Sequence, residues 1–162
     1  MVDPKIGVQA SDFCLPEGDG KSVSLKKVLK EGKGKWVVLY FYPKDETTGC
    51  TVEAISFSRA LGDFNKFEAK IIGISPDSEE SHCKFIENHK LKIILLSDAA
   101  KKVIKAYGAY GKKNLYGKEV EGVIRTTFLM DPSGEIAYVW RNVRAEGHAE
   151  EVLDKLRELH GM

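Results

Sequence analysis

The sequence has few cysteines, almost no net charge and no paired metal ligands. Its 162 residues include three cysteines, Cys14, Cys50 and Cys83. This small, odd number argues against a framework of structural disulfides. The chain has no C-x-x-C pair, and its four histidines lack metal-ligand spacing, so no metal is expected. The formal net charge of +1 gives no electrostatic reason to expect nucleic acid or an anionic membrane as a partner.

Long apolar segments are also missing. No stretch is apolar over the length that a bilayer span requires, and residues 1–5 lack the apolar core of a secretory leader. We therefore expect a cytoplasmic protein without a membrane partner. No glycine-rich phosphate loop precedes a helix in the required way, and no cofactor is predicted. The histidines, His82, His89, His148 and His160, are expected at the surface.

The composition is that of a folded globular chain. Hydrophobic residues make up 43% and charged residues 30% of the sequence, so disorder is not indicated. The length suggests one domain over residues 1–162. A domain of this size buries enough surface to fold without a disulfide or a metal.

The stretch 36–53 organises the rest of the chain. Residues 36–42 form an unbroken apolar and aromatic run, which predicts a strand buried on both faces. Pro43 ends the run, because proline has no N–H for a strand ladder. After Thr47, Thr48 and Gly49 comes Cys50, followed by apolar residues at helical spacing up to Phe67. A cysteine is thus predicted where a buried strand gives way to a helix.

That position favours a reactive cysteine. The first turn of a helix presents free N–H groups and the positive end of the helix dipole, and both stabilise a thiolate, which is the nucleophilic form. The hydroxyl of Thr47 is placed to face the sulfur or a bound substrate oxygen. The alternatives are that Thr47 or Thr48 only caps the helix, and that Cys50 is a buried, inert cysteine.

The string from Pro43 to Cys50 resembles the P-x-x-x-T-x-x-C pattern of peroxiredoxins. The wider text, F-Y-P-K-D followed by T-x-G-C-T-V-E-A, is similar to the bacterioferritin-comigratory or peroxiredoxin Q class. The resemblance implies that Cys50 is the peroxidatic cysteine, that Thr47 hydrogen-bonds the peroxide, and that Pro43 shields the pocket from water. It extends to the N-terminus, where A-x-D-F-x-L-P precedes D-G-K-x-V-S-L.

The order of predicted elements indicates an α/β fold. A hairpin over 11–25 and a short helix over 25–29 precede the strand at 36–42, and a surface loop is expected at 111–117. Buried strands at 70–75 and 93–97 alternate with helices, which implies parallel pairing. A strand at 123–130, a returning strand at 135–140 and an amphipathic helix at 147–159 complete the pattern. We expect a thioredoxin-like sandwich with a central mixed sheet and an N-terminal β-hairpin.

Arg125 interrupts the apolar strand predicted at 123–130. The text I-x-R-x-T-F-L resembles the peroxiredoxin segment whose arginine stabilises the thiolate and polarises the peroxide. A guanidinium suits both tasks because it stabilises negative charge on sulfur and on the leaving oxygen. The alternative is an arginine of an edge strand paired with a surface carboxylate. Glu53, in the first turn after Cys50, is a possible ion-pair partner.

The resemblance also bears on the second cysteine. Some members of the class carry a resolving cysteine five residues after the peroxidatic one, but Ile55 stands there. Others carry it on the next helix, predicted here over 78–88, near Ile86. Cys83 is the cysteine on that helix, and we expect it to form a disulfide with Cys50 after local unwinding. Cys14 is expected to fill an apolar slot, or to serve as an alternative resolver.

The resulting hypothesis is a thiol peroxidase that reduces hydrogen peroxide and alkyl hydroperoxides without a cofactor. Thioredoxin or a similar dithiol would reduce the Cys50–Cys83 disulfide, and the resemblance favours a monomer. The alternatives are a one-cysteine peroxidase, a thiol-disulfide oxidoreductase and a redox-inactive thioredoxin-like binding module. Threonine at the position of the first cysteine of a C-x-x-C argues against a disulfide carrier.

Overall fold

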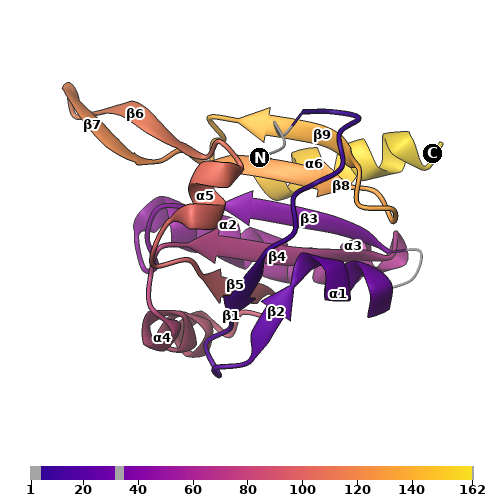
Figure 1. Ribbon diagram of the computed structural model, residues 1–162, viewed down its shortest axis with the longest axis horizontal. Coiled ribbons are helices and arrows are strands. Elements are labelled where there is room, and N and C mark those ends of the chain that lie inside the picture. Colours follow the sequence, from indigo (N-terminus) through magenta and orange to yellow (C-terminus); the bar gives the residue numbers. More distant parts are fainter. Residues whose placement is uncertain (1–4, 32–34, 162) are drawn as a thin grey trace.

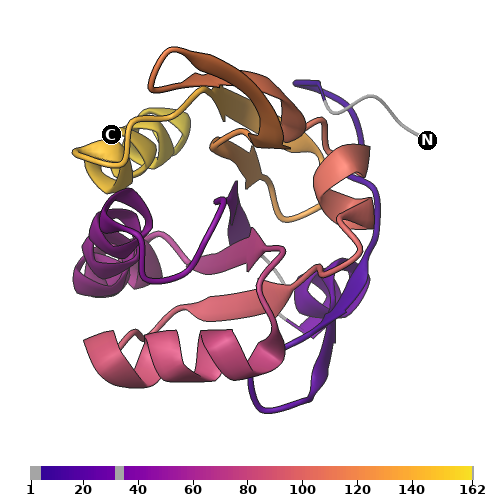
Figure 2. The same cartoon turned by 90° about the vertical axis from the view of Figure 1, so that its left-hand side faces the viewer.

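The computed structural model describes residues 5–31 and 35–161. Helices cover both faces of a central sheet, giving the three layers visible in Figures 1 and 2. Along the chain the elements are β1 (Cys14–Pro16), β2 (Ser22–Ser24), α1 (Leu25–Glu31), β3 (Trp36–Phe41), α2 (Thr48–Arg59), α3 (Leu61–Lys66), β4 (Ala69–Ser75), α4 (Glu79–His89), β5 (Ile94–Ser97), α5 (Lys102–Ala106), β6 (Tyr110–Leu115), β7 (Lys118–Val123), β8 (Thr126–Met130), β9 (Ile136–Arg141) and α6 (His148–Leu159).

The central sheet has the order β5-β4-β3-β8-β9. β3 pairs in parallel with β4, and β4 with β5, whereas β8 and β9 are antiparallel. The parallel pairs follow from the helical crossovers, and the antiparallel pair from the tight turn at residues 131–134. The predicted mixed sheet and the N-terminal hairpin of β1 and β2 are confirmed.

β3 is the central strand, and its apolar run is buried on both faces. Val38 and Tyr40 point into the layer of α2, α3, α4 and α6, while Val37, Leu39 and Phe41 point into the layer of α1 and α5. Alternate residues of a strand face opposite sides, so an unbroken apolar run fits a strand that is covered on both sides. This strand leads directly to the segment that carries Cys50.

Two expectations for residues 111–130 are wrong. The segment 111–117 is not an irregular loop: β6 and β7 form a second antiparallel hairpin, with Lys112 opposite Glu121. The strand predicted over 123–130 is divided, because β7 ends at Val123 and β8 begins at Thr126. The sequence pattern did not predict β6 and β7 because most of their side chains are polar. A hairpin that projects from the body of the protein shows little alternation of apolar and polar residues (Figure 1).

Smaller differences concern helices. The helix behind Cys50 is broken at Ala60, which serves as the C-cap of α2 and the N-cap of α3. The helix predicted over 78–88 is confirmed as α4, with the Ser78 hydroxyl accepting a hydrogen bond from the Ser81 N–H. None of the helices in the described ranges has the length and apolar content needed to cross a bilayer.

The surface prediction for the histidines is wrong for two of the four. His82 and His148 are fully buried. Each is hydrogen-bonded: His82 to Asp45 and to the Leu96 carbonyl, and His148 to the Thr127 hydroxyl. Burial lowers the pKa of His148, against an opposing effect of Glu151. A buried histidine needs such partners, and these lie too far away in the sequence to be predicted.

Candidate active site

Cys50 lies in the first turn of α2, two residues after the helix begins at Thr48. Its side chain is 1% exposed. β3 ends at Phe41, and the segment 42–47 carries the chain from the sheet to the helix. The N-terminal end of α2 therefore presents its free N–H groups and its positive dipole next to the sulfur, as the sequence predicted. The environment favours a thiolate over an inert thiol.

Arg125 connects Cys50 to Glu53. One guanidinium nitrogen, Nη2, donates a hydrogen bond to Cys50 Sγ at 3.1 Å, and Nη1 donates to Glu53 Oε1 at 3.1 Å. Arg125 lies between β7 and β8, at the bend where the projecting hairpin joins the central sheet. Its carboxylate partner is buried, so the alternative of a surface ion pair is wrong. The site thus has a fixed cation in contact with the sulfur.

Glu53 is the buried acid of the site. Its side chain is 1% exposed, and its Oε2 atom has no hydrogen-bond partner among the described residues. The Tyr40 hydroxyl is likewise buried without a partner there. Burial raises the pKa of Glu53 to about 7, even though Arg125 acts in the opposite direction. The carboxyl group therefore changes charge near neutral pH while it holds the arginine.

This titration predicts a pH-dependent stability. The folded-state pKa of Glu53 lies above its value of 4.5 in an unfolded chain, so its contribution is fully favourable below about pH 4.5 and is lost as the pH rises through 7. We expect a loss of about 3 kcal/mol over this range. Glu53→Gln keeps the shape but does not ionise. In urea unfolding, the stability of Glu53→Gln relative to the wild type should rise by this amount between pH 4.5 and 8; a constant difference would contradict the prediction.

Gly49 allows the guanidinium to reach the sulfur. A Cβ atom at this position would lie 2.6 Å from Arg125 Nη2 and 3.3 Å from its Cζ. Contacts below 3.0 Å do not occur between real Cβ atoms and their neighbours, so any larger residue must displace the guanidinium. The sequence offered Gly49 only as a residue of the loop before the helix. Its role in admitting Arg125 depends on a segment 76 positions later in the chain and was not predictable from local pattern.

We expect Gly49→Ala to lower the rate constant for oxidation of Cys50 by hydrogen peroxide about tenfold, because small misplacements of a catalytic group are costly. The arginine side chain is flexible, so the fold should be retained. Gly62→Ala in α3 is the matched control, since a Cβ there would meet nothing within 4 Å. Stopped-flow fluorescence during oxidation measures both variants. Equal rates for both would show that Gly49 has no such role.

Thr47 and Pro43 lie in the segment before α2. The Thr47 hydroxyl donates to the Lys44 carbonyl at 2.8 Å, and it makes no capping hydrogen bond to the helix. The alternative that the Thr47 side chain only caps α2 is therefore wrong. With its proton directed at Lys44, the hydroxyl oxygen can accept a hydrogen bond from a hydroperoxide O–H. Pro43 is half-buried at the end of β3.

A buried polar cluster fixes this segment to α4. Asp45 Oδ2 lies 2.6 Å from His82 Nδ1, and His82 Nε2 donates to the Leu96 carbonyl at 2.9 Å. The Tyr42 hydroxyl donates to Asp45 Oδ1 at 2.6 Å. Breaking such a buried pair by removing one partner typically costs several kcal/mol. Sequence reasoning missed Asp45 and His82, which are 37 residues apart.

The same cluster could be mistaken for a metal site. Ligand atoms of Asp45, Asp77 and His82 lie within 4.8 Å of one another. However, the Asp45 N–H donates to Asp77 Oδ2 at 2.7 Å, and the Ser75 hydroxyl donates to the same atom at 2.7 Å. These donors already occupy Asp77 Oδ2, and both Asp45 carboxylate oxygens have hydrogen-bond partners as well. The cluster is therefore assigned a structural role.

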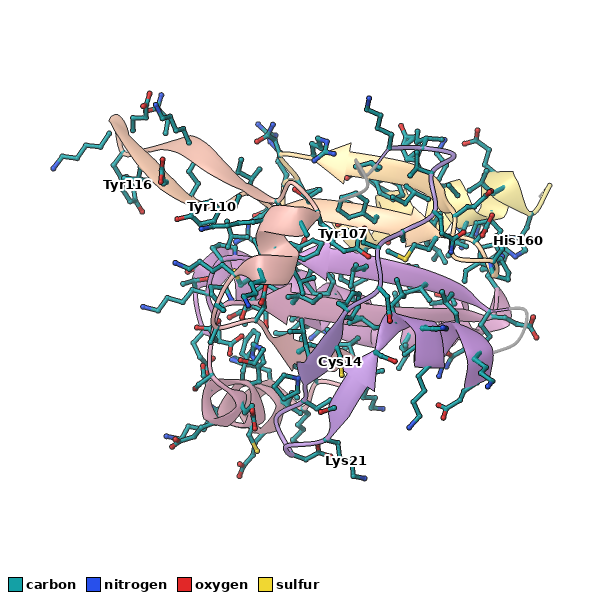
Figure 3. The ribbon with its side chains drawn as sticks, viewed as in Figure 1. Cys14, Lys21, Tyr107, Tyr110, Tyr116 and His160 are labelled. Atoms are coloured by element: carbon teal, nitrogen blue, oxygen red, sulfur yellow. The ribbon has the colours of Figure 1, made fainter. Side chains whose placement is uncertain are left out.

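Cys83 lies outside this cluster. It is exposed on α4, one residue after the buried His82. Its backbone packs against the β1–β2 turn, because a Cβ atom on Gly18 would lie 3.1 Å from the Cys83 nitrogen. Cys50 is buried under Arg125, and both cysteines are free. Cys14 is also exposed on β1, so the expected apolar slot is wrong (Figure 3).

A cavity of about 430 Å³ adjoins the site. Its lining includes Arg125 and Gly49, the apolar side chains of Val52, Val143 and Ala145, and three polar residues, Thr48, Arg144 and Glu146. Half-buried apolar side chains beside a guanidinium suit a molecule with an apolar part and one polar end.

The comparisons with known protein families, sequences and structures agree with one another. The model of the AhpC/TSA family matches residues 6–139. A Helicobacter pylori protein named putative peroxiredoxin bcp is 49% identical over 96% of this chain and 100% of its own length. Peroxiredoxin Bcp of Bacillus subtilis is 42% identical over 96% of both chains. The structure of a cysteine-to-serine variant of Xylella fastidiosa PrxQ superposes with a TM-score of 0.88 at 33% identity and full coverage of both chains.

Proposed function

From the premise that the chain belongs to the AhpC/TSA family, in its Bcp and peroxiredoxin Q class, we propose that Cys50 is the cysteine with which this thiol peroxidase attacks hydroperoxides. The observation that carries the assignment is the hydrogen bond of 3.1 Å from Arg125 to Cys50 Sγ at the start of α2. This hydrogen bond brings a guanidinium into contact with Cys50, which is buried, whereas Cys14 and Cys83 are exposed. A cation and a helix N-terminus together favour the nucleophilic thiolate.

The proposed reaction uses the geometry of the site directly. The Cys50 thiolate attacks the near oxygen of the hydroperoxide, a sulfur–oxygen bond forms, and the oxygen–oxygen bond breaks. The far oxygen leaves as alkoxide or hydroxide and takes a proton from solvent, while Cys50 becomes a sulfenic acid. Arg125 stabilises negative charge as it moves from sulfur to the leaving oxygen. Thr47 accepts a hydrogen bond from the substrate O–H, and Pro43 excludes water.

For the second half of the cycle, we keep Cys83 as the resolving cysteine. Its thiol would condense with the Cys50 sulfenic acid, releasing water and forming a disulfide. Cys50 is buried, whereas Cys83 is exposed on α4. We therefore expect α4 or the start of α2 to move before the two sulfur atoms come within bonding distance. Several contacts between the segment before α2 and α4 oppose this movement, among them the pair of Asp45 and His82 and the hydrogen bond of 2.5 Å between Glu46 and His89.

Mass spectrometry after one equivalent of hydrogen peroxide tests both roles. Free thiols are alkylated, and the protein is weighed intact and then mapped by peptides. A rapid loss of two hydrogens that maps to Cys50 and Cys83 would support the peroxidatic and the resolving assignments together. Addition of one oxygen at Cys50 alone would support a one-cysteine peroxidase. Oxidation at Cys14 or Cys83 with Cys50 unchanged would overturn the proposal.

The cavity beside Arg125 supports alkyl hydroperoxides as substrates, in addition to hydrogen peroxide. The bacterioferritin comigratory protein of Xanthomonas campestris, which has alkyl peroxide reduction activity, has a similar structure, with a TM-score of 0.82 at 38% identity over 93% of this chain and 92% of that one. In this chain, Val52, Val143 and Ala145 would contact the alkyl part while the O–O group lies against Arg125. Contact with the alkyl part would favour larger substrates through burial of apolar surface.

A larger side chain in the cavity should affect the reduction of alkyl hydroperoxides more than the reduction of hydrogen peroxide. We expect Ala145→Phe to lower kcat/KM for cumene hydroperoxide about tenfold, because the added ring occupies the space of the alkyl group. Hydrogen peroxide is the control on the same protein, and its kcat/KM should stay within about twofold, since it needs no such space. Peroxide consumption at several concentrations measures both values. An equal decrease of kcat/KM for both substrates would show that the cavity does not bind the alkyl part of the substrate.

The proposed reductant and compartment are those that would allow the proposed Cys50–Cys83 disulfide to be reduced. Thioredoxin or a similar dithiol protein remains the proposed electron donor, and the cytoplasm, where thiols are kept reduced, the proposed compartment. The monomeric state remains a prediction.

A further inference from the structure

The hairpin of β6 and β7 brings a second cation toward the active site. It projects from the end of the sheet toward which β3 points, and its tip carries Tyr116, which is 98% exposed (Figures 1 and 3). β7 ends at Val123, and one further residue, Ile124, separates it from Arg125. Any side chain held near the base of this hairpin is therefore close in space to the guanidinium that contacts Cys50.

Lys113 is such a side chain. Its ammonium group donates a hydrogen bond of 2.8 Å to the Val123 carbonyl, two residues before Arg125. Gly122 leaves room for this route, since a Cβ atom there would lie 3.2 Å from Lys113 Cε and would crowd the lysine side chain. The lysine side chain thus lies along β7 and is half-buried. Lysine side chains at a surface normally extend into water, so this fixed position is a distinct feature.

The neighbouring lysine behaves differently. Lys112 points to the other face of the hairpin, as alternation along a strand requires. Its ammonium group pairs with Glu119 at 3.6 Å, and both side chains are well exposed. The two lysines therefore share a strand and a charge but differ in direction, in partner and in burial. They form a natural matched pair for an experiment.

Lys113 interacts electrostatically with the charged groups of the proposed active site. Burial and the Arg125 guanidinium lower the pKa of Lys113, whereas Cys50 raises it. The ammonium group thus lies within electrostatic reach of both members of the catalytic contact. Glu53, which pairs with Arg125 Nη1 at 3.1 Å, opposes the positive charge of the guanidinium when it is ionised. Without a further cation, that carboxylate would neutralise much of the charge that Arg125 offers to the sulfur.

We propose that Lys113 is a positioning residue of the peroxidase reaction: held by the Val123 carbonyl over Gly122, it supplies a second positive charge that stabilises the Cys50 thiolate. The inference rests on the assignment of Cys50 as the peroxidatic cysteine. Lys113 acts on the sulfur through its charge and not by contact. Its effect should therefore weaken as salt screens the interaction.

The test is a thiolate titration that needs no turnover. Cys14→Ser and Cys83→Ser are introduced first, so that the pH-dependent absorbance at 240 nm reports on Cys50, and Lys113→Met, Lys113→Arg and Lys112→Met are compared in this background. We expect the titration midpoint of Lys113→Met to rise by about half a pH unit, with an approximately threefold slower oxidation by hydrogen peroxide below the midpoint. Lys112→Met should match the background protein, and Lys113→Arg should remain close to it.

Salt supplies a second measurement that is independent of packing. Raising potassium chloride from 20 to 500 mM should move the midpoint of the background protein upward and that of Lys113→Met less. Equal midpoints and equal salt responses for Lys113→Met and Lys112→Met would overturn the role of Lys113. Failure of the underlying assignment looks different: one equivalent of hydrogen peroxide would then leave Cys50 of the background protein unoxidised, whichever lysine is present.

Discussion

Replacement of Cys50 by serine is expected to lower the rate constant for hydrogen peroxide reduction by roughly four orders of magnitude or more, as removal of an enzyme nucleophile does elsewhere. A serine hydroxyl is not ionised at neutral pH, so neither Arg125 nor the start of α2 can produce a comparable nucleophile from it. The buried position of the side chain suits this exchange, because serine is slightly smaller than cysteine. The fold should remain intact.

The other two cysteines are the matched controls. Cys14→Ser should retain the full rate of the first oxidation and full turnover, because Cys14 is exposed on β1, which belongs to a separate two-stranded sheet. Cys83→Ser should retain the first oxidation but lose turnover with a dithiol protein. Competition with horseradish peroxidase for hydrogen peroxide measures the first step. If Cys50→Ser keeps the wild-type rate, a different residue is the nucleophile.

The second large effect is expected at Arg125. Arg125→Met removes the donor to Cys50 Sγ and should lower the rate constant for hydrogen peroxide by about 10²- to 10³-fold, the loss typical of one donor in a preorganised site. Arg125→Lys should recover part of the activity. An ammonium group keeps the charge but lacks the planar fork that reaches Cys50 and Glu53 together.

Loss of the arginine also leaves Glu53 buried without its partner, which could lower stability and confuse the interpretation. The double variant Arg125→Met with Glu53→Gln removes this complication. It should unfold at a urea concentration near that of the wild type and still be about as slow as Arg125→Met. Arg157→Met on α6 controls for the loss of a surface arginine, since Arg157 pairs with Asp154 in solvent. A double variant with wild-type rates would exclude a catalytic role for Arg125.

Local sequence determined the framework of the site. The apolar run of β3, the proline that ends it and the helical spacing after Cys50 depend on residues close together in the chain. They therefore predict a reactive cysteine at the start of a helix without reference to any distant contact. The parallel order of the strands also followed, because helical crossovers between buried strands permit little else. Arg125 was identified by its resemblance to a family segment and not by its pattern alone.

Tertiary structure decided what surrounds the sulfur. Arg125 and Cys50 are 75 positions apart, and their contact depends on the absence of a side chain at Gly49. The burial of Glu53 and His82 and the course of Lys113 over Gly122 likewise depend on pairings between distant segments. The periodicity of apolar residues shows which face of a helix or strand is buried. It carries no information on which polar group from a distant segment will contact a buried polar group. The sequence by itself therefore placed Cys50, the proposed nucleophile, on its helix, and the packing of separate segments decided which charges lie around it.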